Sequence, residues 1–363
     1  MSLLVPEAVP RSRVTRSLSA PRTTAVPWTL AVLTACLVAV AALLPGPASA
    51  ARGEPTARYT FPGPGTRADD GARVVEVKPL GKRTADLVIE SPAMGTKLPV
   101  RVILPHSWTS QPRRAFPTLY LLQGASDDYT SWTRETDVHE LSEGSEALIV
   151  TPEGGRAGFY TNWYNNGRRG TPRWETFHTV ELPQILERGW RANQRRALIG
   201  VSEGGLGALN YAARHQGAYL YTASFSGITD LDDRYLRTAV RLTCLREGVD
   251  SERLWGHPWR QRHVWDAHNP SYRIERFRGV RVHVSAATGL PGEYEDEDDI
   301  NVGGGMLEGP TFKPTRRFAR ELREVGVDVT SNLYLTGTHS WPYWERELHT
   351  VWSDVLATLQ AAP

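Results

Sequence analysis

The chain has 363 residues, of which 40% are hydrophobic and 23% charged, and its formal net charge is +2. This is the composition of a globular protein, so wholesale disorder and fibrous structure are excluded. Two cysteines in the whole chain exclude a disulfide-rich scaffold and a cysteine-rich zinc module.

The first 50 residues have the pattern of a secretory signal peptide. Four arginines precede an uncharged apolar run over 28–44, and Ala48, Ser49 and Ala50 supply a small-residue cleavage site. This order predicts secretion with cleavage after Ala50. Two alternatives remain open: the long apolar run also suits an uncleaved anchor, and Cys36 closes a lipobox-like tetrad that suits lipid attachment.

Cleavage after Ala50 removes four arginines and one glutamate, so the net charge changes from +2 to about −1. No net positive field then remains to favour nucleic acid as a partner. Cleavage also removes Cys36 and leaves Cys244 alone, so no intramolecular disulfide can form. The mature chain must be held together by its core, and its length is sufficient for one large domain.

The elements expected along the chain alternate between strands and helices. Residues 51–83 mix Gly, Pro, Arg and Asp without periodicity and predict an irregular lead-in to a single domain over 84–363. Apolar runs predict strands over 85–90, 98–104, 117–122, 147–151, 197–201, 220–225 and 280–287. Helical periodicity lies at 174–189, 203–214, 314–325 and 341–359. This alternation predicts an α/β fold, a mostly parallel doubly wound sheet with helices on both faces. The poorly periodic stretch 227–275 predicts an irregular excursion near the site.

The most informative segment runs from Gly200 to Gly204 and reads Gly-Val-Ser-Glu-Gly. It lies directly between the predicted strand 197–201 and the predicted helix 203–214. A serine at such a sharp strand-to-helix turn is exposed at the carboxyl edge of the sheet, and the helix N-terminus points at a developing oxyanion. The alternative is a glycine-rich turn capped by the serine. The placement favours Ser202 as a nucleophile.

A serine nucleophile needs a base, which follows it in the chain order of α/β-hydrolases. Seven of the ten histidines come after Ser202. His339 stands in the segment 335–341, directly before the predicted last helix 341–359, where a flexible loop can bring it over the sheet edge. The others are His215, His257, His263, His268, His283 and His349, which fall in helices, a strand or the irregular region. We therefore predict His339 as the base.

The acid that would orient this histidine is not selected by position. Seven carboxylates lie between the strand 280–287 and the predicted helix 314–325, ahead of His339, namely Glu293, Glu295, Asp296, Glu297, Asp298, Asp299 and Glu308. The acidic run 293–299 is most simply a solvated loop, and a calcium site is its alternative, without EF-hand spacing.

Five motifs in order over about residues 90–355 resemble the antigen 85 mycolyltransferase branch of the esterase D-like superfamily. They are the segments 120–132, 159–164, 174–183, 200–204 and 337–341. The resemblance implies an α/β-hydrolase fold and a serine esterase or acyltransferase without cofactor or metal.

The resemblance also implies roles for single residues. The acid of the family lies in a Phe-Leu-Glu motif, and Met306, Leu307 and Glu308 occupy the corresponding place, so Glu308 is the implied acid. The implied oxyanion-hole donors are the backbone N–H groups of Ala125 and Glu203, which tolerate side-chain change.

Two departures concern the sugar site of the family. Gln123 stands where the family has a trehalose-binding aspartate, and Ser126 stands where an arginine is expected. Gln123 still offers a hydrogen bond to a sugar hydroxyl, but no charge-assisted one. Trp341 matches a residue that lines the sugar site, and packing of the last helix is its alternative reading.

Three functions follow. The first is a secreted serine hydrolase of acyl esters that works through an acyl-Ser202 intermediate, with water as acceptor. The second is an antigen 85-type acyltransferase, of the mycolyltransferase or diacylglycerol acyltransferase kind, that passes the acyl group to a sugar or glycerol hydroxyl. The third is an extracellular adhesion or binding protein on the same scaffold. All three place the protein outside the cell or at the cell envelope.

Overall fold

The computed structural model describes residues 59–295 and 300–361, all of which belong to one compact unit. The predicted signal peptide lies outside these residues. Within the described residues, nine strands form one sheet in the order β1-β2-β3-β5-β4-β6-β7-β8-β9. The strands are β1 (Arg73–Pro79), β2 (Thr84–Ser91), β3 (Thr96–Ile103), β4 (Phe116–Leu122), β5 (Leu148–Pro152), β6 (Ala192–Val201), β7 (Tyr221–Phe225), β8 (Arg281–Ala287) and β9 (Val329–Tyr334).

The sheet changes direction along its width. β1, β2, β3 and β5 pair antiparallel, whereas β5, β4, β6, β7, β8 and β9 pair parallel. The carboxyl ends of the parallel strands therefore meet at one edge, where loops from several strands converge. This mostly parallel sheet, covered by helices, confirms the expected fold class.

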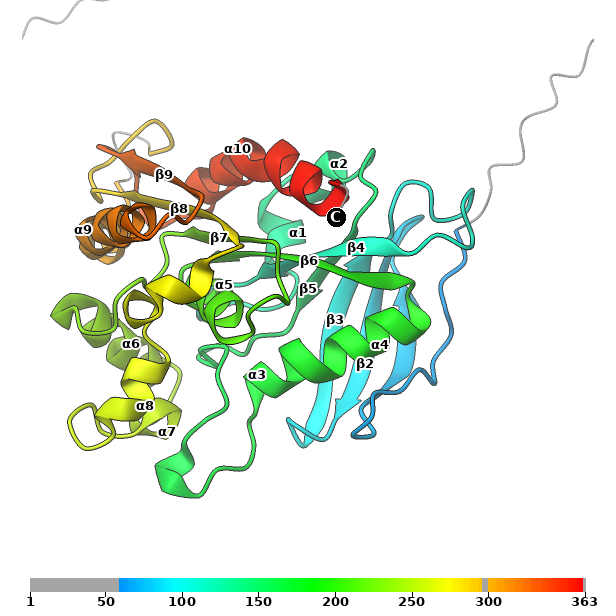
Figure 1. Cartoon of the computed structure of the whole chain (residues 1–363), viewed down its shortest axis with the longest axis horizontal. Helices are drawn as coiled ribbons and strands as arrows, with labels where there is room; N and C mark the ends of the chain where they lie inside the picture. Colours follow the sequence, from blue (N-terminus) through cyan, green and yellow to red (C-terminus); the bar gives the residue numbers. More distant parts are fainter. Residues whose placement is uncertain (1–58, 296–299, 362–363) are drawn as a thin grey trace, which may run out of the picture. The chain divides into compact units, whose positions relative to one another are not determined.

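Helices cover both faces of the sheet (Figure 1). α1 (Ser131–Glu135), α2 (Val138–Leu141) and α10 (Trp341–Gln360) lie on one face. The other face carries α3 (Trp174–Thr176), a π-helical turn (Phe177–Glu181), α4 (Leu182–Gly189), α5 (Glu203–Arg214) and α9 (Val302–Glu324). α6 (Arg234–Arg246), α7 (Glu252–Trp255) and α8 (Arg262–Ala267) follow β7.

The side chains of β4 show why this strand must lie in the middle of the sheet. All of its residues are buried. Leu119 and Leu121 pack with α10, whereas Tyr120 and Leu122 pack with α4 and α5 on the opposite face. Successive side chains of a strand point to opposite faces, so a strand covered on both sides has no polar alternation.

Four expectations differ from the structure. The expected strands did not include 329–334, which forms β9 at the end of the sheet. Residues 51–83 were expected to be irregular, but 73–79 form the edge strand β1, because Val74 is buried against β2. α9 begins at Val302 rather than near 314, since Asn301 caps it and tertiary contacts hold a glycine- and proline-containing first half as a helix. The excursion 227–275 is largely helical, and its helix α6 buries a stripe of Leu236, Val240 and Cys244.

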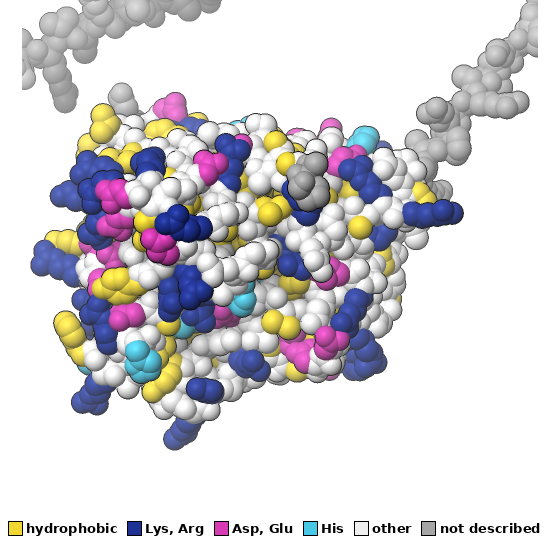
Figure 2. All heavy atoms as spheres, viewed as in Figure 1, with side chains coloured by type: hydrophobic (Ala, Val, Ile, Leu, Met, Phe, Trp, Pro, Cys, Tyr) yellow, Lys and Arg dark blue, Asp and Glu magenta, His cyan; other side chains and the backbone are white. Residues whose placement is uncertain are grey.

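The surface mixes both signs of charge. On the face drawn in Figure 2, basic and acidic side chains are interspersed, and apolar side chains lie between them. Cys244 is a free, buried thiol. Among the described residues, no helix combines the length and the apolar character that a membrane span requires.

Candidate active site

Ser202 stands at the turn that joins β6 to α5. Its backbone has φ 54° and ψ −116°, a conformation that costs free energy for a residue with a side chain and that recurs at functional sites. The neighbouring glycines make the turn feasible. A Cβ on Gly200 would lie 2.0 Å from the Gly204 carbonyl oxygen, and one on Gly204 would lie 2.4 Å from the Gln123 carbonyl oxygen. The sequence therefore forces the serine hydroxyl out at the carboxyl edge of the sheet.

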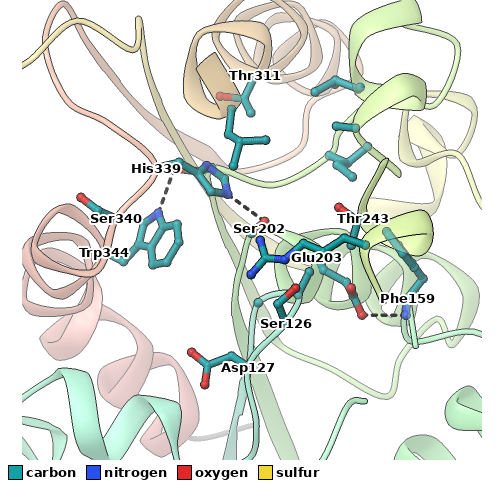
Figure 3. Close-up of a pocket in the computed structure, with 18 of the residues that line it drawn as sticks. Ser126, Asp127, Phe159, Ser202, Glu203, Thr243, Thr311, His339, Ser340 and Trp344 are labelled. Atoms are coloured by element: carbon teal, nitrogen blue, oxygen red, sulfur yellow. Dashed lines mark hydrogen bonds between the residues drawn. The ribbon is translucent and has the colours of Figure 1, made fainter. Parts of the chain in front are cut away.

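Ser202, His339 and Glu308 form a continuous hydrogen-bonded chain. His339 Nε2 lies 2.8 Å from Ser202 Oγ, and His339 Nδ1 lies 2.7 Å from Glu308 Oε2. A carboxylate only accepts hydrogen bonds, so Nδ1 carries the proton and Nε2 is free to accept from the serine hydroxyl. Figure 3 shows the imidazole directed at the serine. The arrangement can deprotonate the hydroxyl.

Glu308 is held by groups that the sequence analysis did not identify. Its Oε1 accepts hydrogen bonds from Ser226 Oγ at 2.9 Å and from the Ala287 backbone N–H at 2.7 Å. The Trp344 indole donates to Ser226 Oγ at 3.0 Å. The carboxyl is 1% exposed, so these donors replace water around its charge. Sequence gives no signal for Ser226, because its role depends on strands meeting at the sheet edge.

The acidic run has a different role near the histidine. Glu295 accepts hydrogen bonds from Thr338 Oγ1 and the Tyr343 hydroxyl, which flank His339 in the chain. These donors lower the pKa of Glu295 against the opposing effect of burial. Glu293 pairs with Arg346 at 3.3 Å. The other acidic residues of the run, Asp296, Glu297, Asp298 and Asp299, lie outside the described residues.

Two backbone N–H groups lie beside the serine. Ala125 and Glu203 both line the cavity that contains Ser202 and His339. Neither N–H donates a hydrogen bond to another group in the described part of the chain. Glu203 is the first residue of α5, so its N–H has no helical acceptor and points with the helix dipole. These are the properties of an oxyanion hole.

The side chain of Glu203 was not singled out by the sequence. It is 2% exposed, and its Oε1 accepts a hydrogen bond from the Phe159 N–H at 2.7 Å (Figure 3). Burial raises the pKa of Glu203 to about 8 in spite of the opposing effect of the Phe159 and Gly158 backbone N–H groups. At pH 7 this shift favours the neutral carboxyl.

The cavity over Ser202 has a volume of about 350 Å³. One part of its lining is apolar and comes from α6, α9 and the loop after β7; these residues are Ile228, Leu236, Ala239 and Leu307. A second part is polar and comes from the loop after β4 and the end of α6; these residues are Ser126, Asp127, Thr243 and Arg246. The cavity can thus hold an apolar group and a polar group of one ligand.

The two residues expected at a sugar site lie in different surroundings. Trp341 lines the cavity and packs edge-to-face on Trp132 and Trp344. Gln123 does not line it. The Gln123 side chain is buried, its Nε2 donates to the Asp127 carbonyl at 2.7 Å, and its Oε1 accepts from the Gly154 N–H at 3.3 Å. The protein backbone already satisfies this amide, so a hydrogen bond from Gln123 to a sugar stays a prediction that these contacts do not favour.

Among the described residues, the side chains placed to share a metal ion are Asp137, Glu345 and His349, and none of them lines the cavity. Their own contacts account for the arrangement. His349 Nε2 lies 2.9 Å from Asp137 Oδ1, and Glu345 accepts from the Asp137 N–H at 2.9 Å, which fastens α10 to α2.

A strained serine between strand and helix, on a mostly parallel sheet of this order, defines the α/β-hydrolase class. Residues 91–354 match the family described as "Putative esterase", and the chain belongs to this esterase family.

The expected resemblance to antigen 85 proteins is confirmed by curated relatives. The chain is 29% identical over 286 residues to diacylglycerol acyltransferase/mycolyltransferase Ag85C of Mycobacterium avium, covering 75% of this chain and 77% of the relative. It is 30% identical over 295 residues to Ag85B of Mycolicibacterium smegmatis, covering 75% and 84%.

Solved structures share the fold. Mycobacterium tuberculosis MPT51 (FbpC1) superposes with a TM-score of 0.63 at 24% identity, covering 76% of this chain and 98% of that one. An S-formylglutathione hydrolase from Agrobacterium tumefaciens gives a TM-score of 0.58 at 14% identity, covering 79% and 99%.

Proposed function

We propose that this protein is a serine acyl-ester hydrolase/acyltransferase with Ser202, His339 and Glu308 as its catalytic triad. The observation that carries the proposal is the hydrogen-bonded chain from Glu308 through His339 to the hydroxyl of a strained serine. Family membership and the names of the relatives point to the same chemistry.

The reaction has two halves. His339 Nε2 takes the proton of Ser202 as Oγ attacks the ester carbonyl, and the Ala125 and Glu203 N–H groups stabilise the oxyanion. His339 then protonates the leaving alcohol, and an acyl-Ser202 ester remains. In the second half His339 deprotonates an acceptor hydroxyl, which attacks the acyl group and releases the serine. Glu308 keeps the imidazole in the required tautomer and stabilises its positive form.

The acyl chain is best placed on the apolar part of the cavity between α6 and α9. Leu236 and Leu307 line it there, and burial of their surface with a hydrocarbon chain would contribute about 25 cal/mol per Å². The polar part near Ser126 and Asp127 suits the alcohol side of the ester or the incoming acceptor.

The acceptor distinguishes the two candidate activities. Water gives hydrolysis, whereas a sugar or glycerol hydroxyl gives transfer, the activity named for the relatives. The Gln123 amide already forms hydrogen bonds with backbone groups. An acceptor sugar would therefore bind to Trp341 and to the polar part of the cavity near Ser126 and Asp127. Gln123 is uncharged and stands where the family has a trehalose-binding aspartate, which favours hydrolysis or an acceptor other than trehalose.

We further propose that the protein acts outside the cell, as the sequence of residues 1–50 predicts. A sole role as an extracellular binding protein is the third candidate. It predicts that a serine-directed phosphonate leaves Ser202 unmodified.

Product analysis tests the proposal. Purified protein lacking residues 1–50 would be incubated with a series of acyl esters, with and without trehalose, glucose or glycerol, and the products identified by mass spectrometry. Free acid alone, unchanged by the added alcohols, identifies a hydrolase. An acylated sugar or glycerol formed at the expense of free acid identifies an acyltransferase. No turnover above the Ser202→Ala control would overturn both.

A further inference from the structure

The carboxyl group of Glu203 is buried beside the nucleophile without a cation. One of its oxygens, Oε1, accepts from the Phe159 N–H at 2.7 Å. The other, Oε2, is buried and has no hydrogen-bond partner in the described part of the chain. A charge on such a group would be poorly solvated, which favours the neutral acid. This uncompensated acid lies one residue after Ser202, directly beside the nucleophile.

The segment that Glu203 contacts has a strained backbone. Phe159 and Tyr160 have positive φ angles of 52° and 50°, a region that residues with side chains rarely adopt. A Cβ on Gly158 would lie 2.1 Å from the Gly154 carbonyl oxygen, so the chain is tightly folded there. Such a conformation persists only where neighbouring groups hold it. Glu203 supplies the acceptor that holds the Phe159 N–H.

The same segment also holds the other oxyanion-hole loop. The Tyr160 hydroxyl donates to the Gln123 carbonyl oxygen at 2.9 Å. The Ser126 N–H donates to the Arg156 carbonyl oxygen at 2.8 Å. Ala125 lies between Gln123 and Ser126 in the chain. The segment 154–160 therefore links the two backbone donors, Ala125 through these bonds and Glu203 through its side chain.

The charged and titratable groups around Glu203 come from three elements. Glu153 after β5 and Glu247 at the end of α6 are acidic, and both raise its pKa further. The cations of this region, Arg156 and Arg246, are paired with Glu247. Two further neighbours, Tyr160 and the Cys244 thiol, have pKa values raised by burial, that of Cys244 to about 12, so both stay neutral. None of these groups offers a free positive charge to compensate a charge on Glu203.

We propose that Glu203 is a positioning residue that works in its protonated form. As a neutral acid it fixes the Phe159 segment, and with it both oxyanion donors. When its proton is lost to solvent, a buried negative charge stands beside the site where the oxyanion develops and opposes it. The inference rests on the proposed function, because it concerns the same oxyanion hole.

The test compares the pH dependence of kcat/KM between pH 6 and pH 10 for a soluble acyl ester. For each protein, kcat/KM at pH 9 is divided by kcat/KM at pH 7, and these ratios are compared. We expect the wild type to lose about tenfold over this range, as for one ionisation near pH 8. Glu203→Gln, which accepts from Phe159 but cannot ionise, should lose the alkaline fall. Glu203→Leu lacks the acceptor and should be at least about tenfold slower than Glu203→Gln at pH 7.

Glu153→Gln is the matched control, since Glu153 is a half-buried acid in the same region, whose pKa burial also raises. It should keep the alkaline fall and move it to lower pH, because the charge that raises the pKa of Glu203 is removed. An unchanged fall in Glu203→Gln, or its loss in Glu153→Gln, would overturn the inference. If the wild type neither turns over esters nor reacts with a serine-directed phosphonate, the proposed function fails instead.

Discussion

At the scale of single residues, the proposed chemistry depends on Glu308 more than on any other residue outside the nucleophile and base. Its two oxygens have separate tasks: Oε2 orients His339, and Oε1 is satisfied by Ser226 and Ala287. A side chain of the same shape without charge would keep the packing but would support the wrong imidazole tautomer.

Glu308→Gln should therefore lower kcat by about 10³–10⁴-fold with little change in the free energy of unfolding. Steady-state hydrolysis of a short-chain ester measures the rate, and urea denaturation measures the stability. Glu293→Gln, which changes an exposed acid that pairs with Arg346, serves as the control and should keep wild-type kcat. A full rate in Glu308→Gln would contradict the assigned role.

The raised pKa of Glu203 also predicts how the free energy of unfolding depends on pH. Its pKa is raised from 4.5 to about 8 in the folded protein, so the folded state holds a proton that the unfolded state has lost between these values. The free energy of unfolding therefore falls as the pH rises from about 4.5 to 8. Above pH 8 both states have lost the proton, and Glu203 causes no further change. Glu203→Gln removes this loss.

The expected gain of Glu203→Gln over the wild type is close to zero at pH 4.5 and about 3 kcal/mol at pH 7. Urea denaturation at pH 5, 6, 7 and 8 would measure it. A difference in stability that does not change with pH would show that Glu203 titrates normally.

At the scale of elements, the sequence predicted the end of the strand before the serine and both ends of the helix after it, although β6 begins at Ala192 rather than at residue 197. β6 ends at Val201 and α5 spans Glu203–Arg214, as expected from the apolar run and the glycine pattern. α9 was missed over its first twelve residues, because glycines and two prolines disfavour a helix that tertiary contacts nevertheless hold.

The site residues were likewise predictable only where the local sequence or a motif determines their position. His339 contacts Ser202, and Glu308 contacts His339, as the loop position and the family motif suggested. The direction of the Gln123 side chain and the buried acid of Glu203 depend on contacts between segments far apart in the chain, which one sequence does not display.

The serine turn predicts a steric effect at Gly200. Gly200→Ala would place a methyl group 2.0 Å from a backbone carbonyl oxygen, where no side chain can give way. We expect a loss of at least about 3 kcal/mol in the free energy of unfolding.

Gly303→Ala in α9 is the matched control. A Cβ there has no heavy atom within 4 Å, so this change should leave stability equal or raise it by up to about 1 kcal/mol. The account of the turn is wrong if thermal unfolding shows Gly200→Ala to be as stable as Gly303→Ala.

At the scale of the whole molecule, β1 belongs to the fold rather than to a lead-in. Val74 on β1 is 1% exposed, and Ala72 beside it is fully buried. Their removal would uncover β2, whose Leu87 and Ile89 are buried in the same core, and would leave an apolar sheet edge open to aggregation.

Removal of residues 51–83 in addition to 1–50 should therefore lower the free energy of unfolding by at least about 3 kcal/mol and promote aggregation. Differential scanning calorimetry and light scattering would measure this against protein that lacks residues 1–50 alone. Equal melting temperatures and a monodisperse sample would show that residues 51–83 are an irregular lead-in that the fold does not need.

The central claim is that Ser202 forms a covalent acyl intermediate, and a serine-directed fluorophosphonate tests it most directly. Intact-protein mass spectrometry followed by peptide mapping would locate and count the adduct in the wild type, in Ser202→Ala and in His339→Gln. The account predicts one adduct per chain on Ser202 in the wild type, none in Ser202→Ala and labelling slowed at least about 10³-fold in His339→Gln. An unmodified Ser202, or an adduct on another residue at the same rate, would contradict it.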